Sequence, residues 1–128
     1  MIDRTDLVSR VYDAFAAGDG PALTELLDGI EWREAAGMPY GGTYRGFAEV
    51  AANVFGPINR DVENFSAKPD SLLPAGDAKV LALGRYRGTG AAGEVDVPFA
   101  HVWTAADGRL THFEQHVDTH LFRQALGQ

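Results

Sequence analysis

The chain of 128 residues contains no cysteine. It therefore has no disulfide, no thiolate nucleophile and no cysteine-ligated metal, which is common in a reducing compartment. Basic residues are also scarce, since 11 Lys and Arg stand against 18 Asp and Glu, for a net charge of −7. This balance, and the scatter of the basic residues along the chain, argue against binding to nucleic acid or to an anionic membrane surface.

No hydrophobic run approaches the length of a membrane-spanning helix, and the first ten residues, MIDRTDLVSR, lack the apolar core of a signal peptide. We therefore expect a cytoplasmic protein. Hydrophobic residues make up 45% of the chain and charged residues 23%, as in an ordinary globular protein. At this length we expect one domain, residues 1–128, that buries roughly two-thirds of the surface of its unfolded chain.

The first half of the chain has mainly helical patterns. Asp3 is placed to cap a first helix, Gly18 to end it, and Gly56-Pro57 to end the last helix of this half. The expected elements are a helix to Ala17, a short helix that starts at Pro21, a strand at Ile30–Glu34, a glycine-rich loop at Ala35–Arg45 and a helix at Gly46–Phe55.

The second half is rich in β-branched and aromatic residues. Asp107-Gly108 is typical of a tight hairpin, and Leu72-Leu73 is expected to extend a strand beyond an irregularity at Pro69. The expected strands are Val62–Lys68, Lys79–Thr89, Glu94–Ala105 and Arg109–Val117. Helices followed by a strand meander predict the α+β class, with N-terminal helices packed on a curved antiparallel sheet and a cavity at its open end.

The closing stretch, Leu110–Leu126, concentrates candidate chemistry. Its strand pattern changes to helical spacing at Asp118, three of the four histidines lie near this residue, and the fourth, His101, lies on the preceding strand. Asp118 has two interpretations that are compatible: a general base with a pKa raised by burial, or the N-cap of the short C-terminal helix. His101, in the aromatic strand VPFAHVW, is either a core histidine or a catalytic or ligand-binding group.

A metal site is a further possibility on the last strand. His112, Glu114 and His116 share one strand face, which is the pattern of a facial metal triad. The opposite face carries Phe113 and Val117, and we expect this apolar face to line the cavity. The histidines then lie on the outer face, so we expect no metal and no cofactor.

The remaining candidates are aromatic or polar side chains expected on the cavity wall. Gln115, which is polar among apolar neighbours, is expected to orient a ligand. Glu34 could be a second acid, but at the end of a strand it is expected to be exposed, and Arg85 and Arg87 are expected on an outer face. The predicted cavity wall consists of Tyr12, Phe15, Trp32, Phe55, Phe99, Trp103, Phe113, Gln115 and Val117.

Three stretches of the chain resemble the NTF2-like superfamily: VYDAFAAGD, WREAAGMPYGGTYRG and LALGRYRGTGAAG…FAHVWTAADGRL…EQHVDTHLFRQALG. The most similar branch is the SnoaL-like group, which includes polyketide cyclases, with ketosteroid isomerases as more distant relatives. The resemblance implies a cone-shaped α+β barrel and a homodimer packed through the outer surface of the sheet.

The resemblance also assigns roles to particular positions. In SnoaL-like cyclases the general base is an Asp before the closing helix, which corresponds to Asp118. In ketosteroid isomerases the base falls near Trp32–Glu34, the oxyanion-binding Tyr at Val11 and the protonated Asp at about His101. Val11 cannot donate a hydrogen bond, although Tyr12 is its neighbour, so steroid isomerase activity is not implied.

These observations leave three hypotheses for function. The first is a cofactor-independent enzyme of the isomerase or aldol cyclase type that acts on a small or mid-sized apolar carbonyl compound, with Asp118 as the base and His101 as the donor to the enolate oxygen. The second is a non-catalytic module that binds a small hydrophobic molecule in the same cavity. The third is a protein-interaction role, which would need an apolar outer patch.

Overall fold

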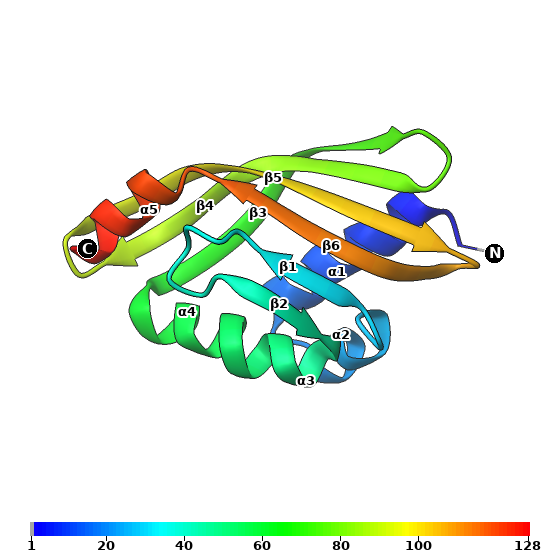
Figure 1. The fold of residues 1–128 in the computed structure, drawn as a ribbon, viewed down its shortest axis with the longest axis horizontal. Coiled ribbons are helices and arrows are strands. Elements are labelled where there is room, and N and C mark those ends of the chain that lie inside the picture. The colour runs from blue at the N-terminus through cyan, green and yellow to red at the C-terminus, as the bar shows by residue number, and fades with distance from the viewer. Residues whose placement is uncertain (1) are drawn as a thin grey trace.

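The computed structural model describes residues 2–128 and has the order of elements that the α+β class predicts (Figure 1). Helices come first, four long strands follow, and a short helix closes the chain. The elements are α1 (Arg4–Ala17), α2 (Gly20–Leu26), β1 (Glu31–Glu34), β2 (Gly42–Arg45), α3 (Gly46–Val50), the π-helical turn η1 (Ala51–Phe55), α4 (Gly56–Asp61), β3 (Glu63–Ala75), β4 (Lys79–Gly90), β5 (Gly93–Ala106), β6 (Arg109–Val117) and α5 (Thr119–Leu126).

The strands form one open six-stranded sheet in the order β2-β1-β6-β5-β4-β3. The pairs from β3 to β6 are antiparallel, as expected for a meander. Strand β1 differs, because it lies parallel to β6 with Trp32 opposite Phe113. This parallel pair brings the first strand of the chain beside the last one and makes the sheet mixed.

The predicted ends of α1 are confirmed. Asp3 accepts a hydrogen bond from the Thr5 amide, and Gly18 closes the helix with a φ of 66° in the left-handed region. The predicted helix end at Gly56-Pro57 is wrong, because the helical path continues through η1 to Asp61. In the π-helical turn the Gly56 amide bonds to the Ala51 carbonyl, and Pro57 occupies a first-turn position where its missing N–H costs little.

The predicted strands are confirmed, but one further strand, β2, was not predicted. Asp107 and Gly108 form the tight β5–β6 turn, both with positive φ (54° and 75°), as a type I′ turn requires. Strand β3 continues past an irregularity between Pro69 and Ser71, as predicted, and reaches Ala75. The glycine-rich loop prediction missed β2, which pairs with β1 but is only four residues long, too short for its alternation to be recognised.

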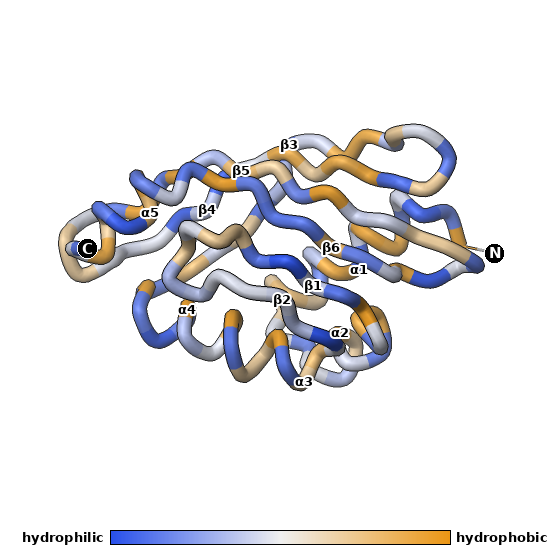
Figure 2. The backbone as a smooth tube through the Cα atoms, viewed as in Figure 1, coloured by the Kyte–Doolittle hydropathy of each residue, from blue (hydrophilic) through white to orange (hydrophobic). Residues whose placement is uncertain are grey.

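The core lies between the sheet and the helices, and its largest fully buried side chains are Trp103, Phe113 and Phe122. Hydrophobic and hydrophilic residues are interspersed along the strands (Figure 2), as expected for a sheet with one covered face. Helix α1 lies along this face, while α3, η1 and α4 form a second helical segment beside it (Figure 1). None of the helices formed by residues 2–128 has the length and apolar character needed to cross a membrane.

Candidate functional site

A cavity of about 40 Å³ lies between α1, the segment η1–α4 and the inner face of the sheet. At roughly 10–15 Å³ for each water centre, it has room for about three water molecules. Side chains from both ends of the chain meet here, which only the folded topology allows. The lining residues are Val11, Tyr12, Phe15, Trp32, Glu34, Val54, Phe55, Ile58, Phe65, Ala67, Tyr86, His101, Trp103, Phe113 and Gln115.

Glu34 is the acidic residue among them, and it is only 2% exposed. Its Oε1 accepts a hydrogen bond from the Trp32 indole N–H at 2.9 Å, while its Oε2 is buried without a hydrogen-bond partner. Burial raises the pKa of Glu34 to about 7, against smaller lowering effects of the Trp32 hydrogen bond and of the Gln115 side chain. A carboxyl group with this pKa can both accept and return a proton near neutral pH.

Two tyrosines hold His101 from opposite sides. The Tyr12 hydroxyl lies 2.5 Å from Nδ1, and the Tyr86 hydroxyl lies 2.5 Å from Nε2. Trp103 donates its indole N–H to the Tyr12 oxygen at 3.0 Å, and Gln115 donates a side-chain N–H to the Tyr86 oxygen at 2.8 Å. Because both ring nitrogens have tyrosine partners, neither is free to form a hydrogen bond with a ligand.

The groups of this network keep one protonation state near neutral pH. Burial, with a smaller contribution from His116, lowers the pKa of His101 to about 3, so the imidazole is neutral. Burial raises the pKa values of the Tyr12 and Tyr86 phenols, which therefore keep their hydrogens. Glu34 is thus the cavity group whose charge changes close to pH 7.

Gln115 connects the network to Glu34. Its Oε1 accepts the Ala35 amide N–H at 3.0 Å, which orients the side-chain NH₂ group toward the Tyr86 hydroxyl. The same side chain also lowers the pKa of Glu34. In addition to any contact with a ligand, Gln115 therefore fixes the relative positions of the phenol and the carboxyl group.

Asp118, expected to be the base, does not line the cavity. It is exposed at the N-cap of α5, where its Oδ1 accepts the Leu121 amide N–H at 3.0 Å. The Asp118 side chain therefore serves as the N-cap of α5, which is the second of the two roles predicted for it. The physical reason is local: a free backbone N–H at the end of a strand is satisfied most directly by the carboxylate beside it.

This placement predicts that Asp118→Ala lowers the free energy of unfolding by about 1 kcal/mol through loss of the cap, while Asp118→Asn leaves it nearly unchanged. Chemical denaturation of both variants measures the difference. Any activity of the cavity should be the same in the Asn variant as in the wild type, because residue 118 lies outside the cavity. Loss of activity in a stable Asp118→Asn variant would bring Asp118 back into the mechanism.

Most of the predicted cavity wall lines the observed cavity. Phe99 and Val117 do not. Phe99 is buried behind the site, with its ring stacked on His101 at a centroid distance of 4.0 Å, and Val117 is its cross-strand neighbour. The predicted wall residues that lie in the lining are Tyr12, Phe15, Trp32, Phe55, Trp103, Phe113 and Gln115.

Two residues of the cavity, Glu34 and Tyr86, are buried although the sequence did not lead us to predict it. Both could have been found by strict two-residue alternation. Glu34 follows Trp32 by two positions and therefore shares its face of β1, and Tyr86 lies between the outward-facing Arg85 and Arg87 of β4. The expected exposure of Glu34 was wrong, because its strand pairs with β6 under the helices and does not end at the surface.

His112, Glu114 and His116 lie on the outer face of the sheet, as expected. Glu114 contacts His116 at 2.7 Å and Arg33 at 3.8 Å in an exposed group of charged side chains. Among the described residues, no group of three or more His, Asp or Glu is arranged to hold a metal ion. The homodimer implied through this face by the resemblance stays a prediction.

Comparison with protein families gives one match, in which a model of SnoaL-like domains covers residues 8–113. No protein among those with curated functions matches the chain.

Solved structures resemble the chain over most or all of its length. An NTF2-like protein from Burkholderia thailandensis is 37% identical, with 98% of each chain covered and a TM-score of 0.91. An NTF2-like protein of unknown function from Burkholderia pseudomallei is 29% identical, with 100% of each chain covered and a TM-score of 0.87. A protein with a ketosteroid isomerase-like fold from Catenulispora acidiphila is 18% identical, covers 87% of this chain and 84% of its own at a TM-score of 0.71, and shows a shared fold alone.

Proposed function

Because the chain belongs to the family of SnoaL-like domains, we propose that it is a cofactor-independent enzyme that transfers a proton on a small or mid-sized apolar carbonyl compound, with Glu34 as the base. The observation that carries the proposal is the Glu34 carboxyl group, which is buried in an aromatic cavity with Oε2 free of hydrogen bonds. A buried carboxyl group with a pKa of about 7 suits general acid–base work at neutral pH.

In the proposed reaction, the Glu34 carboxylate removes a proton from the carbon next to the ligand carbonyl. The electron pair of the broken C–H bond forms the C=C bond of an enolate, whose oxygen is stabilised by a hydrogen-bond donor of the cavity. Protonated Glu34 returns the proton to a conjugated carbon in an isomerisation. In an aldol cyclisation, the enolate carbon instead attacks a second carbonyl of the same molecule, and Glu34 protonates the new alkoxide.

Two further observations support Glu34 over Asp118. The resemblance to ketosteroid isomerases implies a base near Trp32–Glu34, and Glu34 is the member of that segment with a free carboxylate oxygen. Trp32 holds the other oxygen and so fixes the direction of the carboxyl plane. Asp118 has neither the burial nor the contact with the cavity that proton abstraction from an apolar ligand needs.

Exchange of α-hydrogens for deuterium tests the proposal. The probes are cyclohexanone and 2-tetralone in D₂O, followed by proton NMR with and without the protein. We expect exchange to be faster than in buffer by about 10²-fold or more. The rate should rise as pH increases through about 7 and then level off, because only the ionised form of Glu34 is a base.

The cavity groups around Glu34 should not disturb this profile. The charge of Glu34 helps to raise the pKa values of the Tyr40, Tyr44 and Tyr86 phenols, so these phenols stay protonated near pH 7, and His101 is already neutral there.

The alternative function, a non-catalytic module that binds a small hydrophobic molecule, predicts that the ketones bind without exchange. Exchange no faster than in buffer for either ketone would overturn the enzymatic proposal.

A further inference from the structure

The hydrogen-bond network around His101 contains one more hydrogen than its internal contacts can use. At the two ends of the network, Trp103 donates to the Tyr12 oxygen and Gln115 donates to the Tyr86 oxygen. A neutral imidazole has one N–H and one bare nitrogen. Together with two phenol hydrogens this makes three hydrogens, but only two phenol–imidazole contacts exist to use them.

The hydrogen that is left over must be phenolic. The bare ring nitrogen accepts from the tyrosine that faces it, and the ring N–H donates to the oxygen of the other tyrosine. That second tyrosine then accepts two hydrogen bonds and keeps its own O–H free. The tautomer of His101 therefore decides which phenol can donate to something else: Tyr12 if Nδ1 carries the hydrogen, Tyr86 if Nε2 does.

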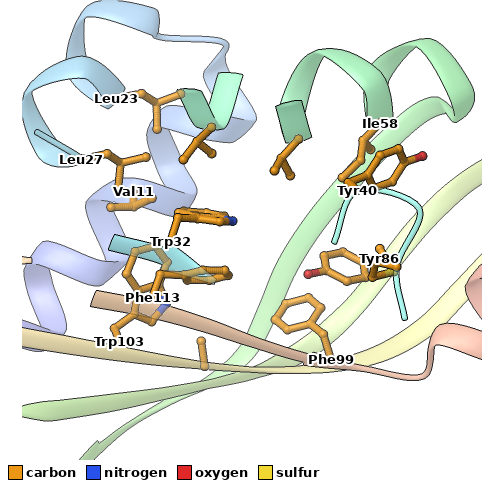
Figure 3. Packing of buried hydrophobic residues seen from close by; sticks show 14 of the residues in the cluster. Val11, Leu23, Leu27, Trp32, Tyr40, Ile58, Tyr86, Phe99, Trp103 and Phe113 are labelled. Carbon is orange, nitrogen blue, oxygen red and sulfur yellow. The ribbon is translucent and has the colours of Figure 1, made fainter. Parts of the chain in front are cut away.

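Three observations favour Tyr86 as the free donor. The charge of Glu34 is one cause of the raised pKa of Tyr86 and is not a cause for Tyr12. Gln115 donates to the Tyr86 hydroxyl and accepts the amide N–H of Ala35, the residue that follows Glu34 in the chain. In Figure 3 the Tyr86 hydroxyl points into the space in front of Trp32, whose indole N–H holds Glu34.

We propose that Tyr86 donates its free hydroxyl hydrogen to an oxygen atom of the ligand, which lies between this hydroxyl and Oε2 of Glu34. The ligand class is then a mostly apolar compound with a carbonyl oxygen, or with the hydroxyl of the corresponding enol, at this position. This assignment rests on the proposed function in taking the oxygen as that of a ketone or its enol. His101 is a positioning residue: with hydrogen on Nε2, it directs the Tyr86 hydroxyl away from itself and toward the ligand.

A matched pair of ligands tests the donor. 4-Fluorophenol resembles an enol, since its oxygen can accept from Tyr86 while its O–H donates to Glu34, and 4-fluorotoluene has the same ring with a methyl group in place of the hydroxyl. Titration followed by ¹⁹F NMR at about pH 8, where Glu34 is ionised, gives both affinities. A cavity with room for about three water molecules leaves little space for either ring, so we expect the partly exposed Phe15 and Phe55 to shift on binding.

We expect wild-type protein to prefer 4-fluorophenol by roughly 10- to 100-fold, the range for hydrogen bonds to charged groups. Tyr86→Phe should lower this preference by roughly 3- to 10-fold, the share expected of a neutral hydrogen bond, because the bond to Glu34 remains. Tyr12→Phe should retain the full preference, because the Nε2–H tautomer remains favourable without Tyr12. Tyr40→Phe is the control for loss of a buried hydroxyl, since Tyr40 bonds to Asp61 and does not line the cavity.

The tautomer of His101 gives an independent readout. In ¹⁵N NMR of the 4-fluorophenol complex, Nε2 should show the signal of a protonated nitrogen and Nδ1 that of a bare one. Loss of the preference in Tyr12→Phe but not in Tyr86→Phe, a protonated Nδ1, or wild-type protein without any preference would each overturn the assignment. Failure of both ligands to bind at millimolar concentration would overturn it as well. Ketone exchange that fails while the phenol preference persists would refute only the proposed function.

Discussion

Glu34→Gln is expected to abolish proton transfer without unfolding the protein. The amide retains the shape of the carboxyl group and can still accept the Trp32 N–H through its oxygen, so the aromatic wall should keep its arrangement. It cannot accept a proton from carbon at neutral pH. Since a positioned general base contributes about 10²- to 10⁴-fold, exchange of ketone α-hydrogens should fall by this factor.

Glu31→Gln is the matched control for this variant. Glu31 lies on the same strand, but its side chain faces outward and pairs with Arg45 and His112 on the surface. Exposed ion pairs of this kind contribute little, so both the exchange rate and the stability should stay close to those of the wild type. Equal rates in Glu34→Gln and wild-type protein, with both folded, would remove Glu34 from the reaction.

The second large effect is a loss of stability as pH rises. Burial raises the pKa of Glu34 from its ordinary value of 4.5 to about 7 in the folded protein. Between these two values the folded state holds a proton that the unfolded chain has released. The contribution is complete below about pH 4.5 and is lost as pH rises through about 7, for a total of about 3 kcal/mol in the free energy of unfolding.

The Glu34→Gln variant isolates this effect, because it lacks the titrating group and keeps the others. Chemical denaturation of both proteins across the pH range gives the difference in free energy of unfolding at each pH. The free energy of unfolding of the variant, relative to that of the wild type, should rise by about 3 kcal/mol between about pH 4.5 and about pH 8. A difference that stays constant over this range would show that the buried carboxyl group has an ordinary pKa.

Local patterns in the sequence were sufficient to predict most of the secondary structure. The cap at Asp3, the stop at Gly18, the Asp107-Gly108 turn and the start of the last helix at Asp118 were all predicted from residues a few positions apart, and all are observed. Such features depend on backbone groups that the nearest side chains can satisfy. The same locality explains the failure at Gly56-Pro57, where a π-helical turn changes the hydrogen-bond partners and lets the helix continue.

The candidate site depended on contacts that no local pattern encodes. The sequence by itself determined the α+β order of elements and which side chains alternate on each strand, and those rules could have placed Glu34 beside Trp32. Only the tertiary structure decided which acid is buried, because that follows from the parallel pairing of β1 with β6 and from contacts such as the Ala35–Gln115 hydrogen bond, which joins residues 80 positions apart. A carboxyl group changes its pKa through the loss of water around it, and the loss of water is set by the packing of distant segments.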